Sequence, residues 1–312
     1  MKNLNRLIAV LAVLVLFVAV DASAAVKDPF DHSNVPIEVQ PTHPNALKIV
    51  LIAGESGPEH PLAEHEHFGG CALLMRMLQQ TPGIASVMAE HGWPSNPETL
   101  KNARTVVFYM DGGGKQTTIA HAEEIQKLMD AGVGIVHLHQ VIDYPSEPGK
   151  QAMEWLGGDY DAASGGARGH WDESFTTFPE SPVTRGVGPF KVNDGWILKL
   201  RFVPGMKGIT PILRTSKLSP KGKPDESTTG TANIVCWTYE RPDGGRAFVL
   251  TGAHPHKNWG VESFRRLVVN GILWTAKVEV PKAGAPVQLD PEDLMQDLTP
   301  KPKKAAKSAK AT

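Results

Sequence analysis

Apolar runs recur along the first half of the chain, and their lengths predict secondary structure. Residues 47–54, 105–110 and 133–138 are continuous apolar segments of strand length, as in parallel strands that are covered on both faces. The segment IASVMAE, residues 84–90, predicts a further strand. Helical patterns alternate with these runs, and the resulting β-α-β-α-β-α-β order is typical of a doubly wound parallel sheet.

The intervening segments carry helix signals. Phe68, Cys71, Met75 and Leu78 form one apolar stripe after the first strand. Asn96-Pro97 predicts a helix start, because asparagine caps a helix and proline fits its first turn. Residues 117–132 predict a helix that ends at a glycine.

The second half of the chain is richer in strands. Residues 157–188 interrupt the rhythm with Gly, Pro and aromatic side chains, and a closing helix is predicted over residues 261–276. Strands are predicted at residues 190–192, 196–202, 209–214, 232–240 and 246–251, the last two joined by the turn RPDGG. We therefore expect a three-layer, flavodoxin-like α/β fold with a mostly parallel central sheet and a β-rich C-terminal part.

Both ends of the chain predict segments outside this domain. Residues 1–24 combine basic residues, an apolar run and an Ala-x-Ala site, so we expect a signal peptide that is cut after Ala24 and a secreted or periplasmic protein. The alternative is an uncleaved anchor. Residues 25–46 predict an N-terminal arm, residues 47–281 the folded domain, and residues 282–312 a disordered tail rich in Lys, Ala and Pro.

The overall charge does not favour a nucleic-acid or membrane-surface partner, because 32 basic residues balance 33 acidic ones. The two cysteines, Cys71 and Cys236, are too few for a disulfide scaffold. We interpret them as buried small side chains, although export leaves a disulfide open.

Polar residues cluster where predicted strands end, which is where parallel α/β sheets bind ligands. The first strand is followed by Glu64, His65, Glu66 and neighbouring residues such as Glu59, His60 and His67. Further clusters are Asp111 before three glycines, His139 with His137 two positions earlier, and His254 with His256. Imidazole and carboxylate groups suit acid–base catalysis near neutral pH, or binding of zinc or a similar divalent ion.

Each cluster also has a structural interpretation. The Glu-His-Glu-His run fits a solvated helix start, and His137 fits a buried histidine with one hydrogen bond. Asp111 fits a turn cap, and His254-Pro255-His256 fits a structural turn. No HExxH, CxxC or phosphate-loop motif accompanies them. The functional interpretation therefore rests on several clusters meeting at one edge of the sheet.

Four longer segments resemble the trehalose-utilisation (ThuA-like) family, which shares the class I glutamine-amidotransferase-like fold. They are LIAGESGPEHPLAEHEHFGG, GVGIVHLH, SPVTRGVGPFKVNDGWILKLRF and GRAFVLTGAHPHKNWGVESFRRLVVNGILWTA, and the resemblance spans about residues 47–281. Amidotransferases of this fold place a nucleophilic cysteine on the turn that here carries His139, and a histidine on the run that here reads His254-Pro255-His256. The resemblance therefore implies carbohydrate chemistry without thiolate acyl transfer.

Two departures from the family pattern bear on the mechanism. Gly195 stands where the family often has an acidic residue, and His137 stands where a small residue is usual. Both weaken a direct transfer of the family's mechanism to this chain.

We expect an exported ThuA-like protein that acts on a keto-sugar or disaccharide, by hydrolysis, elimination or isomerisation. The residues expected to act in catalysis are His139, His254 and Asp111. Those expected to bind substrate are Glu64, Glu66, Trp171 and Trp259, with Trp93 as a further stacking candidate. A divalent metal such as zinc would be held by His65, His139 and His254. The alternatives are a non-catalytic carbohydrate-binding or scaffold protein, and a metal-storage or delivery protein. The expected partner is a small carbohydrate, and the sequence leaves substrate, reaction and oligomeric state open.

Overall fold

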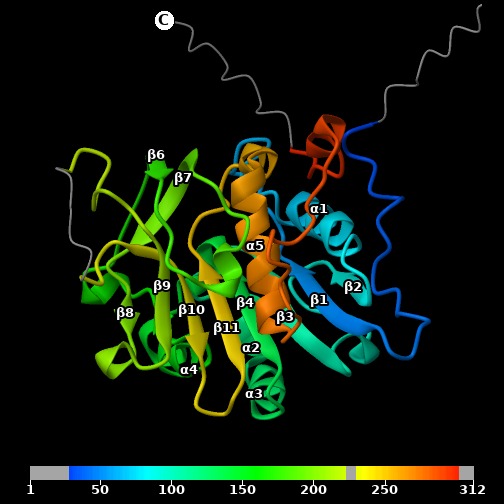
Figure 1. The fold of residues 1–312 in the computed structure, drawn as a ribbon, viewed down its shortest axis with the longest axis horizontal. Coiled ribbons are helices and arrows are strands. Elements are labelled where there is room, and N and C mark those ends of the chain that lie inside the picture. The colour runs from blue at the N-terminus through cyan, green and yellow to red at the C-terminus, as the bar shows by residue number, and fades with distance from the viewer. Residues whose placement is uncertain (1–27, 223–229, 302–312) are drawn as a thin grey trace, which may run out of the picture.

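The computed structural model describes residues 28–222 and 230–301. These residues fold around one seven-stranded sheet (Figure 1). Its strand order is β2 (Ile84–Ala89), β1 (Leu47–Ala53), β3 (Ala103–Tyr109), β4 (Gly134–Leu138), β11 (Arg246–Leu250), β10 (Ile234–Glu240) and β9 (Ile209–Arg214). Strands from β2 to β11 pair in parallel, whereas β10 pairs antiparallel with both β11 and β9. The predicted α/β fold with a mostly parallel sheet is confirmed.

Helices cover both faces of the sheet. The helices α1 (His67–Leu78) and α5 (Glu262–Thr275) pack on one face, and α3 (Ala122–Asp130) and α4 (Ser146–Leu156) pack on the other. In β1, Ile49 and Leu51 join the first core, while Val50 and Ile52 join the second. Burial on both faces is why this strand is apolar at every position from Ile49 to Ala53 rather than at alternate ones.

A two-stranded ribbon, β6 (Ala167–Phe175) with β7 (Phe190–Leu198), flanks the sheet beside a small pair, β5 (Gly158–Asp159) with β8 (Arg201–Phe202). The two strands predicted at 190–192 and 196–202 are therefore wrong in their boundaries. Buried and exposed residues alternate in the first half of β7, whereas all residues of its second half are buried. This change of hydrophobic pattern within one strand is why the sequence predicts two. The ribbon's other strand, β6, was not predicted.

Two predicted helices are shorter than expected. Asn96 does cap a helix, because its side chain accepts from the Glu98 N–H, but only the 3-10 helix η1 (Pro97–Thr99) follows before β3 begins. The helix predicted over 117–132 is broken at His121 into α2 (Thr117–Ala120) and α3. The remaining 3-10 helices are η2 (His139–Ile142), η3 (Ala162–Ser164), η4 (Pro182–Thr184), η5 (Pro204–Met206), η6 (His256–Gly260) and η7 (Pro291–Met295).

The segment after α5 is packed against the domain as far as residue 301, so the disordered tail predicted from residue 282 is wrong over 282–301. Figure 1 shows this segment in red beside α1. Val287 is buried in the core, Leu298 is 2% exposed, and Asp297 forms an ion pair with Arg76 of α1. These buried residues are too widely spaced to give a periodic pattern. The predicted signal peptide and residues 302–312 lie outside the described residues.

Candidate functional site

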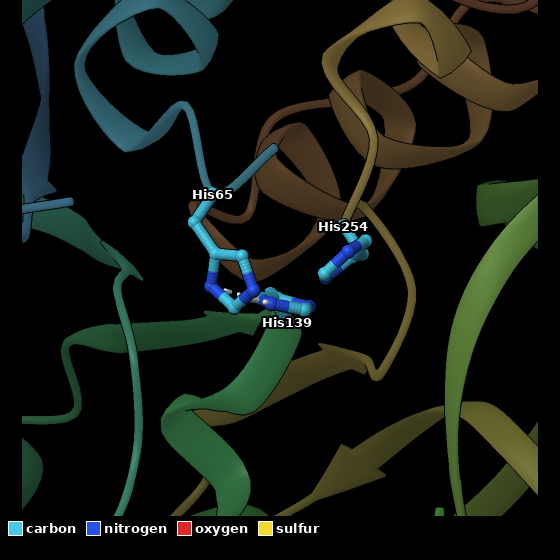
Figure 2. A group of neighbouring side chains, drawn as sticks. All are labelled: His65, His139 and His254. Atoms are coloured by element: carbon cyan, nitrogen blue, oxygen red, sulfur yellow. Dashed lines mark hydrogen bonds between the residues drawn. The ribbon is translucent and has the colours of Figure 1, made fainter. Parts of the chain in front are cut away.

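Four strand ends bring the predicted site residues together. His65 follows β1, Asp111 follows β3, His139 follows β4 and His254 follows β11. One ring nitrogen from each of His65, His139 and His254 lies within 4.8 Å of the others, and Figure 2 shows the three rings facing a common point. Parallel strands end at one edge of the sheet, so this arrangement follows from the topology.

The loops after β1 and β11 are joined by backbone hydrogen bonds. The His65 N–H donates to the His254 carbonyl at 3.1 Å, and the His256 N–H donates to the Ala63 carbonyl at 2.9 Å. Between them, Glu64 and Pro255 form an isolated antiparallel bridge. These contacts fix the separation of the two loops and therefore of the His65 and His254 rings.

Left-handed backbone conformations occur in three of these loops. His65 has φ 53°, His139 has φ 68°, and Ala253, which precedes His254, has φ 73°. Such conformations cost non-glycine residues about 1–3 kcal/mol each and concentrate at functional sites. At His139 the conformation turns the chain from β4 directly into η2.

His137 and His139 have different surroundings, although they are only two positions apart. The His137 ring lies beside Phe108, and its Nε2 is 2.8 Å from the Tyr144 hydroxyl. Burial lowers the pKa of His137 to about 3, so the ring is neutral. Because His139 begins a turn, the two-residue strand repeat no longer applies to it, and its ring lies beside His65 and His254 instead.

Asp111 lies among three histidines from the first loop. Its Oδ1 is 2.5 Å from His65 Nδ1, and its Oδ2 is 3.3 Å from His60 Nε2. Burial alone would raise the pKa of Asp111, but the His65 hydrogen bond and the neighbouring imidazoles lower it overall. The carboxylate therefore favours the tautomer with the proton on His65 Nδ1, the nitrogen that also lies 3.3 Å from His139 Nε2.

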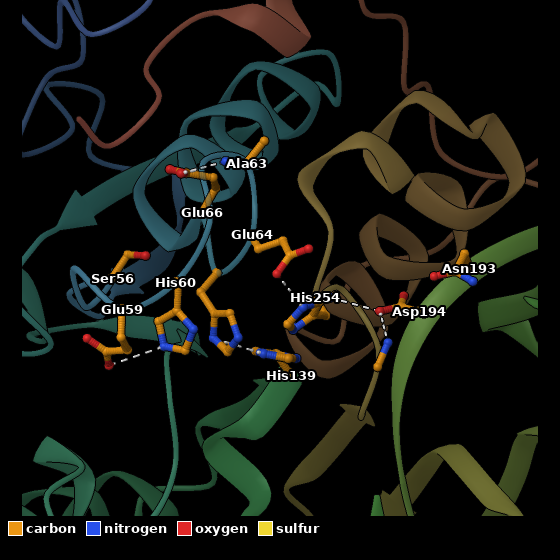
Figure 3. Close-up of polar contacts among 12 residues, drawn as sticks. Ser56, Glu59, His60, Ala63, Glu64, Glu66, His139, Asn193, Asp194 and His254 are labelled. Carbon is orange, nitrogen blue, oxygen red and sulfur yellow. Dashed lines mark hydrogen bonds and ion pairs between the residues drawn. The ribbon is translucent and has the colours of Figure 1, made fainter. Parts of the chain in front are cut away.

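A second buried carboxylate, Asp194 of β7, holds the turn that carries His254. It accepts the His254 N–H at 2.9 Å (Figure 3). It also accepts the Ala253 N–H at 2.9 Å and the Asn258 side-chain amide at 3.0 Å. Burial raises the pKa of Asp194 to about 6, and these hydrogen bonds oppose the shift. Asp194 contacts the backbone, so it is a positioning residue.

Two of the clustered histidines, His139 and His254, are held neutral. Burial, followed by the neighbouring imidazoles, lowers the pKa of His139 well below its usual value. Burial lowers the pKa of His254 to about 4, although Glu64, whose Oε2 is 3.3 Å from His254 Nε2, opposes the shift. A neutral imidazole is the form that binds a metal or accepts a proton.

This donor set fits a divalent metal ion. The Nδ1 atoms of His139 and His254 are buried and have no hydrogen-bond partner among the described residues. His60, His65 and Asp111 form a second group whose ligand atoms also lie within 4.8 Å of one another. Several nitrogens and one carboxylate match zinc and similar ions.

Three predicted substrate-binding residues are placed where they cannot meet a ligand. Trp259 has no exposed surface and packs against Tyr109 and Phe264. Trp171 is 5% exposed, and the Lys217 ammonium lies over its ring. Glu66 is fully buried, and its carboxylate accepts the backbone N–H groups of residues 63 and 299. The two tryptophans serve packing and Glu66 holds backbone groups, so the predicted substrate-binding role of these three residues is wrong.

Of the other candidates, Glu64 reaches the histidines and Trp93 does not. The Glu64 side chain is 40% exposed beside His254. Trp93 stacks on His121, with ring centroids 4.0 Å apart. Its ring contacts are with His121 and Phe108, away from the clustered histidines.

Sequence reasoning missed His170, and it did not select His60. The His170 ring lies 4.5 Å from that of His254, because β6 runs beside β7 with His170 opposite Gly195. The ring of His60 stacks on His65 at 3.5 Å. Only a correct prediction of β6 would have indicated His170. His60, in contrast, lies in the loop rich in Glu and His that the sequence already indicated.

The sheet order and the histidine-lined edge define a doubly wound α/β protein with a site at the strand ends. Residues 50–275 match the model of the ThuA family, whose description is trehalose utilisation. The chain therefore belongs to this family. A comparison with curated proteins gives no match. None of the described helices is both long and apolar enough to cross a lipid bilayer.

Two solved structures of ThuA-like proteins share the fold. The protein from Bacteroides uniformis ATCC 8492 is 14% identical with a TM-score of 0.52, over 80% of this chain and 98% of that one. The protein from Parabacteroides merdae ATCC 43184 is 12% identical with a TM-score of 0.53, over 80% of this chain and 99% of that one. A glutamine amidotransferase from Thermotoga maritima aligns at 10% identity and a TM-score of 0.38, over 74% of this chain and 96% of that one.

Proposed function

We propose that this protein is an exported carbohydrate-active protein that acts on a keto-sugar or disaccharide through histidine and carboxylate groups and a divalent metal such as zinc. The observation that carries the proposal is the convergence of ring nitrogens from His65, His139 and His254. Family membership supports a sugar ligand, because the family is described by trehalose utilisation. Export rests on the signal-like sequence of residues 1–24.

The three histidines would hold the metal, and the surrounding carboxylates would orient them. Three histidines with a fourth position left open are a known ligand set for catalytic zinc. When bound, such an ion polarises a carbonyl group or activates a water molecule. Asp111 fixes the tautomer of His65 through the Nδ1 contact.

Because His254 would hold the metal, Glu64 beside it is the group best placed to move a proton. Their 3.3 Å contact joins a partly exposed carboxylate to a buried neutral imidazole. A base of this kind removes the proton next to a sugar carbonyl, or the proton of an attacking water molecule. Hydrolysis, elimination and isomerisation of a keto-sugar all need that step.

Thiolate chemistry finds no support in this chain. The only cysteines, Cys71 and Cys236, are completely buried in the core, and burial raises the pKa of each thiol well above its usual value. The turn after β4 carries His139. We therefore exclude glutamine amidotransfer from the proposal.

Elemental analysis and a substrate screen test the proposal together. We expect about one zinc ion per chain, lost on chelation and in His139→Ala. The exposed His43, outside the cluster, supplies the control His43→Ala, which should keep the metal. In a screen of 3-keto and unmodified disaccharides, wild type should turn over a keto-sugar and His139→Ala should not. Wild type that binds no metal and converts no sugar would refute the proposal.

A non-catalytic sugar-binding protein is the second candidate, and one observation favours it. Gly195 lies against His254, where a Cβ atom would approach His170 Nε2 to 2.9 Å and His254 Cβ to 3.2 Å. The acidic side chain that the family often has there is missing and would not fit without movement. If sugars raise the melting temperature of wild type and His139→Ala equally, and neither shows turnover, this candidate is correct.

A further inference from the structure

Two cavities adjoin at the edge of the histidine cluster. One has a volume of about 210 Å³ and is lined by Asp111, Gly112 and Lys115 together with Gly54, Glu55 and His91. The other has a volume of about 260 Å³ and is lined by Gly54, Glu55 and His91 together with His32, Phe68 and Thr299. The three shared lining residues make the two cavities one cleft with two compartments.

The first compartment lies at the point in the sheet where the strand order reverses, between β1 and β3. The chain leaves β1 towards α1 on one face, and it leaves β3 towards α3 on the opposite face. Because β1 and β3 are neighbours in the sheet, the segments that follow them diverge to opposite faces and leave a crevice at the carboxyl ends of the two strands. Ligands of open α/β sheets bind in such crevices. Gly54 and Asp111 follow the two strands and both line this compartment.

The polar groups of the first compartment remain available to a ligand. Lys115 is exposed, and its ammonium has no partner among the described residues. Glu55 and His91 are 77% and 69% exposed and pair with each other at 3.1 Å, at the junction of the compartments. Ammonium donors and carboxylate acceptors in one pocket suit the hydroxyl groups of a sugar ring.

The second compartment offers a flatter, partly apolar wall. His32 stacks on Phe68, which is 8% exposed, with ring centroids 3.9 Å apart and an interplanar angle of 10°, so the more exposed His32 ring forms this wall. The His32 ring is held by a 3.1 Å contact from Nε2 to the Leu298 carbonyl. Aromatic rings present an apolar face and a polar edge, the combination that a sugar ring uses.

A larger cavity elsewhere is a weaker candidate for the sugar. It has a volume of about 500 Å³ and lies between the end of β6 and the edge strand β9, with Phe175, Phe178 and Arg214 in its lining. Asp111, which contacts His65 and lines the first compartment, does not line this cavity, and neither do the clustered histidines. A ligand bound there would not reach the groups that carry the chemistry.

We infer that the two compartments bind the two rings of a disaccharide, with the reacting ring beside Asp111 and Lys115 and the second ring beside His32 and Phe68. The inference rests on the proposed function for the nature of the ligand. It adds the positions of both rings and makes His32 and Lys115 residues of different subsites. A single sugar ring should therefore need only the first compartment.

Calorimetric titration with trehalose and with methyl α-glucoside tests this division. In wild type, trehalose should bind about tenfold more tightly than the single-ring probe, since it occupies both compartments. Lys115→Ala should weaken both ligands about tenfold. His32→Ala should reduce trehalose affinity to the level of methyl α-glucoside and leave the latter unchanged. Lys207→Ala, at an exposed lysine of the η5 turn, is the control and should change neither.

The titrations are run on both chelator-treated and zinc-loaded protein, so that the two proposals can fail separately. If the protein shows the expected affinities but never binds zinc, the two-compartment cleft is supported and the proposal of a metal is refuted. Zinc binding without the pattern would refute the cleft alone. Equal affinities for the two probes, binding of neither, or variants that affect both probes alike would overturn the inference. His32→Gln, which retains a donor for the Leu298 carbonyl, is the check if His32→Ala unfolds.

Discussion

The loops after β1 and β11 both bring histidines to the site, but they are held in different ways. The turn after β11 (residues 252–258) is fixed from inside the domain, by the carboxylate of Asp194. The loop after β1 (residues 54–67) is fixed from outside, by a segment at the far end of the chain that we call the C-terminal strap (residues 297–301). The comparison shows that one cluster of three histidines is held by two supports from different parts of the chain.

The inner support is a saturated hydrogen-bond network. Asp194 is completely buried and accepts from Gly195, Ala253, His254 and Asn258. These donors come from β7 and from the turn, so the carboxylate joins the ribbon to the last strand of the parallel part of the sheet. Such a network has no solvent to replace a lost partner.

The outer support consists of separate contacts along the C-terminal strap. The Thr299 N–H donates to Glu66 at 2.8 Å, across 233 residues of sequence, and Asp297 pairs with Arg76 of α1. Lys301 donates to the Ser56 hydroxyl and to the Gly57 carbonyl. The strap therefore holds the loop both near its start and beside His65, the residue that contributes a ring nitrogen to the cluster.

Removing the inner support should give the largest effect. Asp194→Ala leaves several buried N–H groups without acceptors, and each costs about 1–3 kcal/mol. We expect the free energy of unfolding to fall by about 3 kcal/mol, measured by urea denaturation. Exposed Asp172→Ala on the neighbouring strand is the control and should change it little. A loss below about 1 kcal/mol would mean that Asp194 does not hold this turn.

Removing the centre of the outer support should give an intermediate effect. Glu66→Ala deprives the Ala63 and Thr299 N–H groups of their acceptor, at a cost of about 2 kcal/mol. Because Glu66 adjoins His65, zinc affinity should also fall by about 10- to 100-fold, as for other residues that orient metal ligands. Competition with a chromogenic chelator measures the affinity. Glu147→Ala, at an exposed ion pair with Lys150, should alter neither quantity.

The two supports also differ in how far the sequence predicted them. The meeting of His65, His139 and His254 at one edge of the sheet follows from strands that could be recognised by their apolar runs. Asp194 was not identified, because its partners come from a turn about 60 positions away that no local pattern links to it. Glu66 is predicted wrongly as a ligand-binding residue, because the sequence around an acidic side chain among histidines is the same whether that side chain faces solvent or a backbone amide. Trp259 was misassigned in the same way, since a tryptophan in a predicted loop carries no sign of its burial.

The weakest contact of the strap should give the smallest effect and provides the finest test of the comparison. Lys301→Ala removes donors to Ser56 and Gly57, but the ammonium is partly exposed, so we expect a loss of stability of at most about 1 kcal/mol. The loop start should nevertheless become more mobile, because the remaining strap contact acts at Glu66, near the loop's other end. Amide hydrogen exchange should therefore speed up at residues 55–60 and stay unchanged at residues 252–258. Faster exchange in both segments would show that the two supports are coupled rather than independent.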